Sequence, residues 1–199
     1  MSMPLVLASG SAIRAQLLRR AGVEVEVAVP RIDEDALRAS LVAEDVTPRD
    51  LADALAEQKA RKISARRPGT LVIGCDQVLQ SGDATLSKPG TLAEARAQLL
   101  RLRGGTHTLI SACVLCEGGR AVWRHIDTAR LTMRDFSDDY LDLYLARGWP
   151  DIASSVGAYK LEEEGVRLFS RIDGSHFTIL GLPLLPLLLH LGRIGAIDA

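Results

Sequence analysis

The sequence predicts an α/β fold with a mixed central sheet flanked by helices, elongated and bilobal, in a single domain over residues 1–199. Two observations lead to this prediction. Apolar stretches with strand spacing alternate with stretches of helical spacing, and two adjacent strand-like stretches then follow. The length of 199 residues, with 47% hydrophobic residues, also suffices for a sizeable core.

The first half of the chain supplies the alternation. Residues 4–8 form an apolar run typical of a buried strand, and residues 12–21 have helical spacing that stops at a glycine. Residues 23–29 alternate apolar and acidic side chains, which predicts another strand. A threonine cap followed by proline at the first helical position indicates a helix over residues 48–64.

The second half shows the same signals of capping, alternation and Gly-rich turns. The expected elements are a strand over 70–75, a helix from a Thr91 cap to Gly104-Gly105, strands over 107–116 and 121–133, a helix from a Ser137 cap to about Gly148, and a last helix from Pro183.

Composition limits the possible partners and the compartment. With 24 basic and 25 acidic residues the net charge is -1, which argues against a nucleic-acid coat. Three cysteines cannot close a disulfide framework, and Cys113 and Cys116 are expected on opposite faces of one strand, where they cannot share a zinc ion. The short N-terminal apolar run lacks a basic segment before it, and the apolar stretch 177–191 is interrupted by Gly and Pro. We therefore expect a cytoplasmic protein with no nucleic-acid and no membrane partner.

The turn after the first strand is the first candidate site. Ser9-Gly10-Ser11 leads into a helix that carries Arg14 in its first turn. Free backbone N–H groups, the positive helix end and a guanidinium together favour an anion. The alternative is a plain serine cap with no ligand, and the spacing of a P-loop is absent.

An acidic triplet and a lysine form the next two candidates. Asp33-Glu34-Asp35 is expected in a loop, either solvated or as oxygen ligands for Mg²⁺, which keeps waters and substrate phosphates around it. Lys59 lies four residues from both Leu55 and Ile63, on the apolar stripe of its helix. Its ammonium group either snorkels to the surface or reaches into an interior cleft.

A carboxylate follows the apolar strand over 70–75. We expect Asp76 at the carboxyl end of that strand, where open α/β sheets bind ligands. It can hold a metal or act as general base toward water, or it can simply form a turn. Lys88, in the tight loop Ser87–Gly90, can pair with a phosphate.

Taken in order, these segments resemble the Maf family of nucleoside triphosphate pyrophosphatases over nearly the whole chain. The motifs are short, but they occur in the family's order. They are the loop with Ser9, Ser11 and Arg14, then Ile32-Asp33-Glu34, Lys59-Ala60, the strand that ends in Asp76, Lys88-Pro89, Gly104-Gly105-Thr106-His107, and Gly181-Leu182-Pro183.

Within the family, the sequence is most similar to the branch that prefers 7-methyl-GTP. This similarity lies in Asp76-Gln77-Val78, in residues 157–162, and in residues 171–174 followed by Gly181-Leu182-Pro183-Leu184. The branch that prefers dTTP or UTP usually carries Asp-Thr in place of Asp76-Gln77. Three positions depart from the family's pattern: Ala12 replaces a proline, Ile13 replaces an arginine or tryptophan, and Gly105 replaces an arginine. These departures bear on the choice of substrate more than on the reaction.

The resemblance implies an ITPase-like nucleotide cleft and hydrolysis between the α- and β-phosphates, giving a nucleoside monophosphate and pyrophosphate. It implies a house-cleaning role that removes modified nucleotides, a divalent cation such as Mg²⁺, and a possible homodimer. The implied residues are Asp76, Lys59 and Lys88 for catalysis, Ser9, Ser11, Arg14, Gln77, Lys160 and Glu162 for the substrate, and Glu34 and Asp76 for the metal.

Three other functions stay open. They are a pyrophosphatase with dTTP/UTP or broad specificity, a non-catalytic nucleotide-binding regulator of cell division, and an interaction protein that uses its Leu-rich tail. The tail is expected in the core instead, and a silent binder has no need of a water-activating carboxylate. Lysine usage agrees with a site for phosphate, because only 4 of the 24 basic residues are Lys and three of those, Lys59, Lys88 and Lys160, fall in the motifs of the resemblance.

Overall fold

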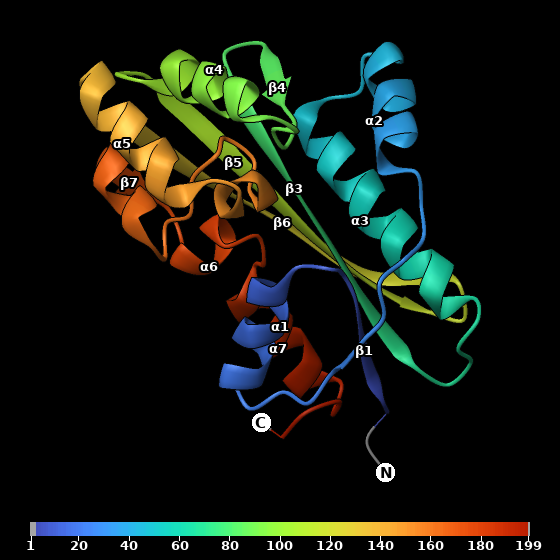
Figure 1. Ribbon diagram of the computed structural model, residues 1–199. Helices are drawn as coiled ribbons and strands as arrows, with labels where there is room; N and C mark the ends of the chain where they lie inside the picture. The colour runs from blue at the N-terminus through green and yellow to red at the C-terminus, as the bar shows by residue number, and fades with distance from the viewer. Residues whose placement is uncertain (1–2, 199) are drawn as a thin grey trace. The chain divides into compact units, whose positions relative to one another are not determined.

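The computed structural model describes residues 3–198 and has the expected mixed α/β fold (Figure 1). The strands are β1 (Leu5–Ala8), β2 (Glu26–Val27), β3 (Leu71–Ser81), β4 (Ala84–Leu86), β5 (Thr106–Glu117), β6 (Arg120–Met133) and β7 (Phe169–Asp173). The α-helices are α1 (Ala12–Arg20), α2 (Glu34–Ala43), α3 (Pro48–Ser64), α4 (Leu92–Leu102), α5 (Asp138–Gly148), α6 (His176–Ile179) and α7 (Leu184–Arg193). Two 3₁₀ helices are η1 (Asp151–Ser154) and η2 (Glu164–Leu168).

The strands of residues 3–198 form one seven-stranded sheet, in the order β2-β1-β3-β5-β6-β7 with β4 paired to β3. β1 runs parallel to both β2 and β3, whereas β4 is antiparallel to β3 and β7 is antiparallel to β6. The sheet is therefore mixed, and helices flank it, which confirms the predicted fold class. No helix of the described residues is long and apolar enough to cross a membrane.

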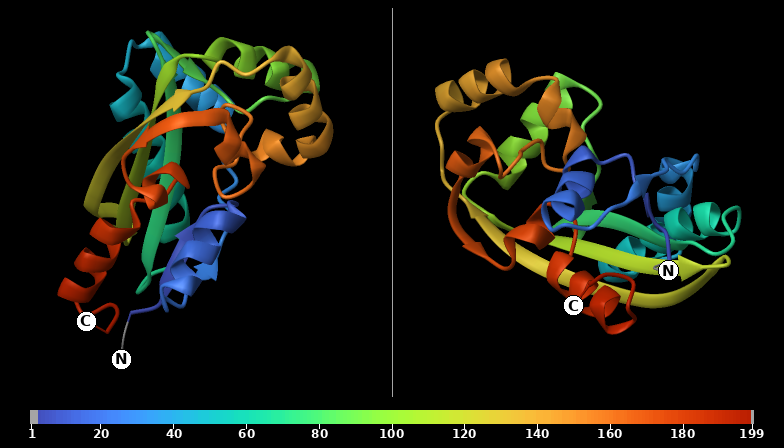
Figure 2. Two further views of the ribbon diagram at one scale, coloured as in Figure 1. Left: turned by 90° about the vertical axis from the view of Figure 1, so that its left-hand side faces the viewer. Right: turned by 90° about the horizontal axis from the view of Figure 1, so that it is seen from below.

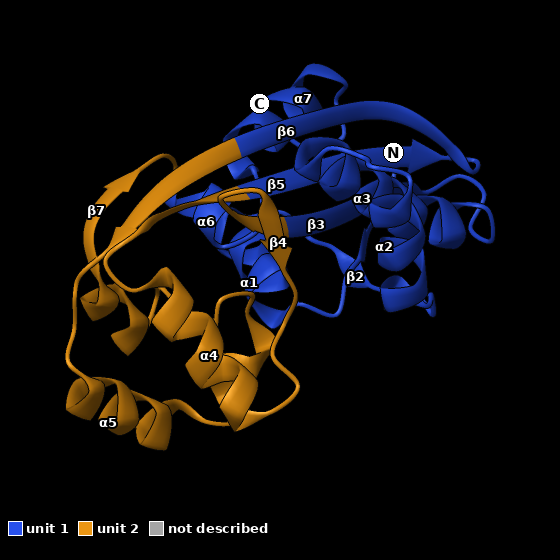
Figure 3. Ribbon diagram, turned by 90° about the horizontal axis from the view of Figure 1, so that it is seen from above, with its two compact units in different colours: residues 1–77, 110–127, 176–199 blue, residues 78–109, 128–175 orange. Residues whose placement is uncertain are grey.

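The chain divides into two compact units (Figure 3). Unit 1 comprises residues 1–77, 110–127 and 176–199, and unit 2 comprises residues 78–109 and 128–175. Three of the four boundaries fall inside β3, β5 and β6, so each of these strands contributes to both units. The single domain predicted for residues 1–199 stays a prediction.

The strands of unit 1 carry helices on both faces. Leu71, Ile73 and Cys75 alternate along β3 and pack in one apolar core with side chains of α1 and α7. Figure 1 shows α1 and α7 on one side of β3 and α3 on the other, and the left view of Figure 2 looks onto the side with α1 (blue) and α7 (red). Successive side chains of β3 therefore point alternately to the α1–α7 side and to the α3 side.

Gly74 brings α3 very close to β3. A Cβ at this position would lie 2.2 Å from the Ala56 carbonyl oxygen and 2.8 Å from the Ala60 backbone nitrogen. No side chain fits there, and small alanines line the helix at the contact, both of them fully buried. The backbone of α3 therefore packs directly against β3 at Gly74, two residues before Asp76.

Three of the predicted helix starts are confirmed by their caps. Thr47 accepts a hydrogen bond from the backbone N–H of Asp50 at the start of α3, and Thr91 accepts one from Glu94 at the start of α4. Ser137 caps α5 in the same way. These side chains satisfy N–H groups that the first turn of a helix leaves unpaired.

The acidic triplet does not form a loop, as we had expected. Asp33 is the N-cap of α2 and accepts a hydrogen bond from the Ala36 N–H, and Glu34 is the first helical residue. The helix escapes prediction because α2 buries no residue completely, so its sequence lacks a clear apolar stripe. The predicted strand over 23–29 is also too long, since only Glu26 and Val27 pair with β1.

Asp76 does not end its strand, because β3 continues to Ser81 and pairs there with β4. The expectation was therefore wrong, although the parallel ladder between β1 and β3 does not extend as far as Asp76. That ladder ends at the pair Ala8 and Gly74, where β1 stops. Asp76 thus lies in mid-strand, just beyond the carboxyl end of the parallel neighbour.

The Leu-rich tail forms α7, which begins after Pro183 as expected. Leu184, Leu187 and Leu191 are buried in the core of unit 1, in agreement with the expected core role. Leu185 and Leu189 are exposed on the opposite side of the helix. All three cysteines are buried and free, so no disulfide supports the fold.

Candidate functional site

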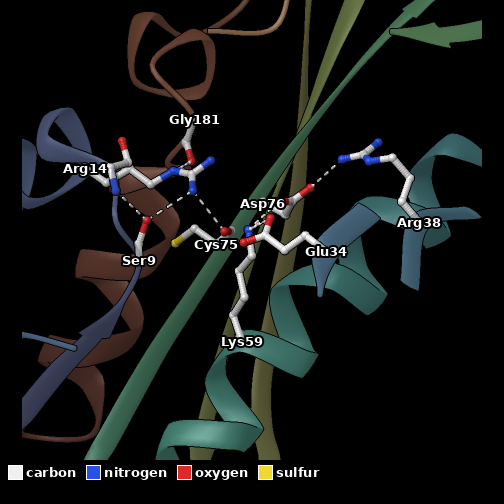
Figure 4. Close-up of polar contacts among 9 residues, drawn as sticks. Ser9, Arg14, Glu34, Arg38, Lys59, Cys75, Asp76 and Gly181 are labelled. Atoms are coloured by element: carbon white, nitrogen blue, oxygen red, sulfur yellow. Dashed lines mark hydrogen bonds and ion pairs between the residues drawn. The ribbon is translucent and has the colours of Figure 1, made fainter. Parts of the chain in front are cut away.

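The centre of the candidate site is the ammonium group of Lys59 (Figure 4). Its Nζ lies 2.7 Å from Asp76 Oδ1 and 2.7 Å from Glu34 Oε2. Lys59 and Asp76 are only 6% and 5% exposed, so the ammonium group does not snorkel to the surface. The structure thus brings together three predicted site residues from α2, α3 and β3.

Local packing explains this arrangement. Lys59 shares the buried stripe of α3 with Leu55 and Ala56, which places its side chain toward the sheet. On β3, Asp76 points to the same side as Gly74, and Gly74 is where the backbone of α3 comes closest. The lysine and the carboxylate meet because the helix and strand that carry them are in backbone contact.

Arg38 joins the cluster from α2 and was not predicted. Its Nη2 lies 3.5 Å from Asp76 Oδ2. Its Nη1 is buried without a hydrogen-bond partner, and so is Asp76 Oδ2. Arg38 follows Glu34 by four residues, and in a helix this spacing places both side chains on one side. The spacing could point to Arg38 only if α2 were already known to be a helix.

A second cluster surrounds the guanidinium of Arg14. Its Nε donates to the Gly181 carbonyl oxygen at 2.7 Å, and its Nη1 donates to the Cys75 carbonyl oxygen at 2.9 Å. The Ser9 hydroxyl accepts a longer contact from the same Nη1 at 3.4 Å. Since β1 ends opposite Gly74, the next carbonyl of β3 has no partner from β1 and is available to Arg14.

These contacts give Arg14 a role in holding three segments of unit 1 together. The backbone N–H of Ser11 donates to Ser9 Oγ at 3.2 Å, and the Ser11 hydroxyl makes no cap hydrogen bond. The structure therefore does not contain the plain serine cap that was the alternative at this turn. Anion binding by Ser9, Ser11 and Arg14 stays a prediction.

Gly181 is required by this second cluster. Its φ of +87° is a left-handed conformation that favours glycine, and a Cβ there would lie 2.9 Å from Arg14 Nη2. In the sequence, Gly181 is marked only by the family motif Gly181-Leu182-Pro183. Its positive φ and its neighbour on α1 are visible only in the folded chain.

Gln77 points to the opposite side of β3 from Asp76. Its Nε2 lies 3.0 Å from each of three acceptors, the Ser111 hydroxyl and the carbonyl oxygens of Thr178 and Ile179. These bonds fix α6 against the strand. The amide nitrogen is thus directed at the protein, and substrate binding by Gln77 stays a prediction.

Cys75 separates the two clusters along β3. Its Sγ lies 3.8 Å from Cys113 Sγ, and this contact is the main cause that lowers the pKa of Cys75, while burial opposes it. The positive charges of Arg14 and Lys59 lower that pKa further. The negative charge of Asp76 raises it, so the sulfur of Cys75 lies near charges of both signs, those of the two clusters.

The carboxylates of the first cluster fit a hard divalent cation. Glu34 and Asp76 both lie within hydrogen-bond distance of one ammonium group, so one small cation can reach both. Asp76 Oδ2 is buried with no hydrogen bond, which leaves it available as a ligand. Within the described residues no group of three or more His, Cys, Asp or Glu could hold a metal. Mg²⁺ is usually held by one or two carboxylates and keeps waters and substrate phosphate oxygens as further ligands.

The remaining predicted residues belong to unit 2. Lys88 is exposed in the loop between β4 and α4, where Ser87 and Gly90 are held by side chains of α4. Lys160 pairs with Asp151 and lies 3.5 Å from Glu163 Oε1. Glu162 is exposed. Their roles toward a substrate stay predictions.

The sequence of this chain is similar to one protein family and to several named proteins. Residues 4–194 fit the family model described as Maf-like protein. A protein of Ruegeria pomeroyi named nucleoside triphosphate pyrophosphatase is 57% identical over 198 residues, which cover 100% of both chains. One of Roseobacter denitrificans with the same name is 56% identical over 195 residues, 98% of each chain.

A third relative carries a more specific name. A 7-methyl-GTP pyrophosphatase of Mesorhizobium japonicum is 48% identical over 198 residues, again 100% of both chains. Among solved structures, a HAM1 protein from Coxiella burnetii matches with a TM-score of 0.42 and 16% identity, over 67% of this chain and 74% of that one.

Proposed function

This chain belongs to the Maf family, and we propose that it hydrolyses the α–β phosphate bond of nucleoside triphosphates, with 7-methyl-GTP as its preferred substrate. The products are a nucleoside monophosphate and pyrophosphate. The chain is a hydrolase that acts on acid anhydrides, and relatives at 57% and 56% identity are named for this reaction class. The preference for 7-methyl-GTP is the finer part of the proposal.

One observation carries the chemistry. Lys59 Nζ lies 2.7 Å from both Asp76 Oδ1 and Glu34 Oε2, so a buried ammonium group joins a buried carboxylate to a partly exposed one. Charged groups act most strongly on a reaction when water is excluded from around them. A silent nucleotide binder has no use for a buried carboxylate that can accept a proton.

Asp76 and Lys59 have distinct roles in the proposed reaction. Asp76 orients the attacking water and accepts its proton as the new oxygen–phosphorus bond forms. Lys59 neutralises negative charge that grows on the phosphate oxygens, and so lowers the barrier for pyrophosphate to leave. The ion pair with Lys59 also fixes the orientation of the Asp76 carboxylate before the substrate binds.

A divalent cation, for which we propose Mg²⁺, would be held by Glu34 and Asp76 and would supply positive charge to the phosphate oxygens. Ser9, Ser11 and Arg14 are proposed to bind phosphate from the turn after β1. Lys88 is proposed as a second neutralising cation. Gln77, Lys160 and Glu162 are proposed as substrate-binding residues on the resemblance alone.

The base preference is supported by two lines of similarity. The motif Asp76-Gln77 and residues 157–162 and 171–174 resemble the 7-methyl-GTP branch. Relatives named for that substrate, from Mesorhizobium japonicum and Brucella abortus, are 48% identical. A cytoplasmic house-cleaning role and a homodimer are part of the same proposal.

The test is pyrophosphate release with Mg²⁺ across a panel of 7-methyl-GTP, GTP, UTP and dTTP. We expect the highest kcat/KM for 7-methyl-GTP. A higher value for UTP or dTTP would move the chain to the pyrimidine-preferring branch. If no triphosphate releases pyrophosphate while nucleotides still bind, the chain is a nucleotide-binding regulator and the proposed activity is wrong.

A further inference from the structure

We infer that Arg38 is a phosphate-binding residue, which exchanges its contact with Asp76 for the triphosphate group of the substrate. This inference rests on the proposed function, because it adds a substrate contact to the same site. It is independent of which base the site prefers.

The position of Arg38 on α2 directs it toward the site. Arg38 follows Glu34 by four residues, so both side chains lie on the same side of the helix. Its side chain is 17% exposed, whereas that of Glu34 is 46% exposed. Arg38 is therefore less accessible to solvent than Glu34, and Figure 4 shows its guanidinium directed toward Asp76.

The guanidinium of Arg38 has unused hydrogen-bonding capacity. Its Nη2 lies 3.5 Å from Asp76 Oδ2, longer than the roughly 2.7–2.9 Å of a charge-assisted hydrogen bond. Its Nη1 is buried with no partner. A buried donor without an acceptor costs about 1–3 kcal/mol, so an acceptor that fills this place is favoured.

Arg14 offers a useful comparison, since it is the arginine that the family motif assigns to phosphate. Its Nε and Nη1 already donate to carbonyl oxygens of Gly181 and Cys75 at 2.7 and 2.9 Å. Arg38 makes no hydrogen bond of that length to Asp76. Of the two guanidinium groups, that of Arg38 has more capacity to bind a new anion.

The charges of the first cluster agree with this assignment. Glu34 and Asp76 balance Lys59 and Arg38, so the cluster is neutral by formal charge. When Arg38 turns from Asp76 to the triphosphate, it exchanges a single carboxylate for a group that carries several negative charges. The planar fork of an arginine matches two phosphate oxygens at once, which an ammonium group cannot do.

The experiment measures binding of inorganic triphosphate by calorimetry, with nucleotide turnover as a separate readout. The variants are Arg38→Ala, Arg38→Lys and the control Arg49→Ala, which removes an exposed arginine at the start of α3. We expect Arg38→Ala to weaken triphosphate binding and raise KM by about tenfold or more, with partial rescue by lysine. Arg49→Ala should bind as the unaltered protein does.

Two results would overturn the inference. One is unchanged triphosphate binding by Arg38→Ala, with a lower melting temperature, which would make Arg38 a structural partner of Asp76 only. The other is a lack of triphosphate binding by the unaltered protein. If triphosphate binds through Arg38 but no nucleotide releases pyrophosphate, the inference stands and the proposed function fails.

Discussion

The Nε of Arg14 donates a 2.7 Å hydrogen bond to the carbonyl oxygen of Gly181, 167 residues later in the chain. This bond connects the first helix to the segment before α7 within unit 1. It also explains why a glycine stands at residue 181, since a side chain there would collide with the guanidinium. The stability of unit 1 therefore depends on Arg14, the arginine to which the family resemblance gives a role in phosphate binding.

Gly181→Ala should destabilise the protein more than Gly195→Ala. Both glycines have positive φ, +87° and +67°, so each alanine costs about 1–2 kcal/mol of backbone strain. Only the alanine at residue 181 meets Arg14, whereas a Cβ at Gly195 has nothing within 4 Å. The clash should add about 1–3 kcal/mol. Urea unfolding of both variants measures the difference, and equal losses would contradict the clash.

Asp76→Asn should keep the fold and lose most turnover. The amide is nearly isosteric but accepts a proton poorly, so we expect kcat to fall by roughly 10²–10⁴-fold. Pyrophosphate release measures the loss, and circular dichroism checks the fold. The control is Asp83→Asn, an exposed aspartate in the turn between β3 and β4. Equal pyrophosphate release by Asp76→Asn and the unaltered protein would remove Asp76 from the mechanism.

Lys59→Ala should lower activity far more than Lys62→Ala. Lys59 contacts both carboxylates of the site, whereas Lys62 donates to the backbone carbonyl of Arg31. We expect a loss of about 100-fold or more in kcat for the first variant, as for other groups that stabilise transition-state charge, and little change for the second. Steady-state kinetics on the best triphosphate measures both. Comparable losses of kcat in the two variants would mean that the effect of a lysine on activity does not depend on which face of α3 carries it.

The stability of the protein should fall between pH 6.5 and pH 4 because of His107. Burial lowers its pKa from 6.5 to about 4, and its ring lies 2.7 Å from the Tyr159 hydroxyl. As the pH falls through this interval, the unfolded chain binds a proton that the folded chain does not, so the free energy of unfolding decreases. The full effect is about 3 kcal/mol at most.

Urea unfolding at pH 7 and pH 5 tests this dependence. His107→Gln should be less stable at pH 7 because it lacks the contact with Tyr159, but its stability should change less with pH. The exposed His176 provides the control, and His176→Gln should keep the pH dependence of the unaltered protein. If His107→Gln keeps it too, other groups cause the effect.

Much of the fold follows from local signals in the sequence. The threonine and serine caps set the starts of α3, α4 and α5, because an unpaired N–H at a helix start needs an acceptor whatever the tertiary structure. The extent of β3 could not be predicted, since it depends on where β1 stops and β4 begins. The length of β3 is therefore set by its partner strands and not by its own sequence.

In the site too, some residues could be predicted from the local sequence and others depend on distant segments. Lys59 and Asp76 were recognisable because a charged residue on a buried stripe or next to an apolar strand is unexpected. Arg38 was not recognisable, since its meaning depends on α2, a helix without a fully buried residue. The bonds of Arg14 to Gly181 and of Gln77 to α6 join distant segments, and no local pattern marks them.

The scarcity of lysine makes the centre of the site observable by spectroscopy. The chain has four lysines, and one of them, Lys59, is buried between two carboxylates. A protein labelled with ¹⁵N only in its lysine side chains would give at most four ammonium signals. The Lys59 protons are shielded from exchange with solvent, so their resonance should be the sharpest. It would report each step at the site, from ion pair to bound phosphate, without a probe being added to the protein.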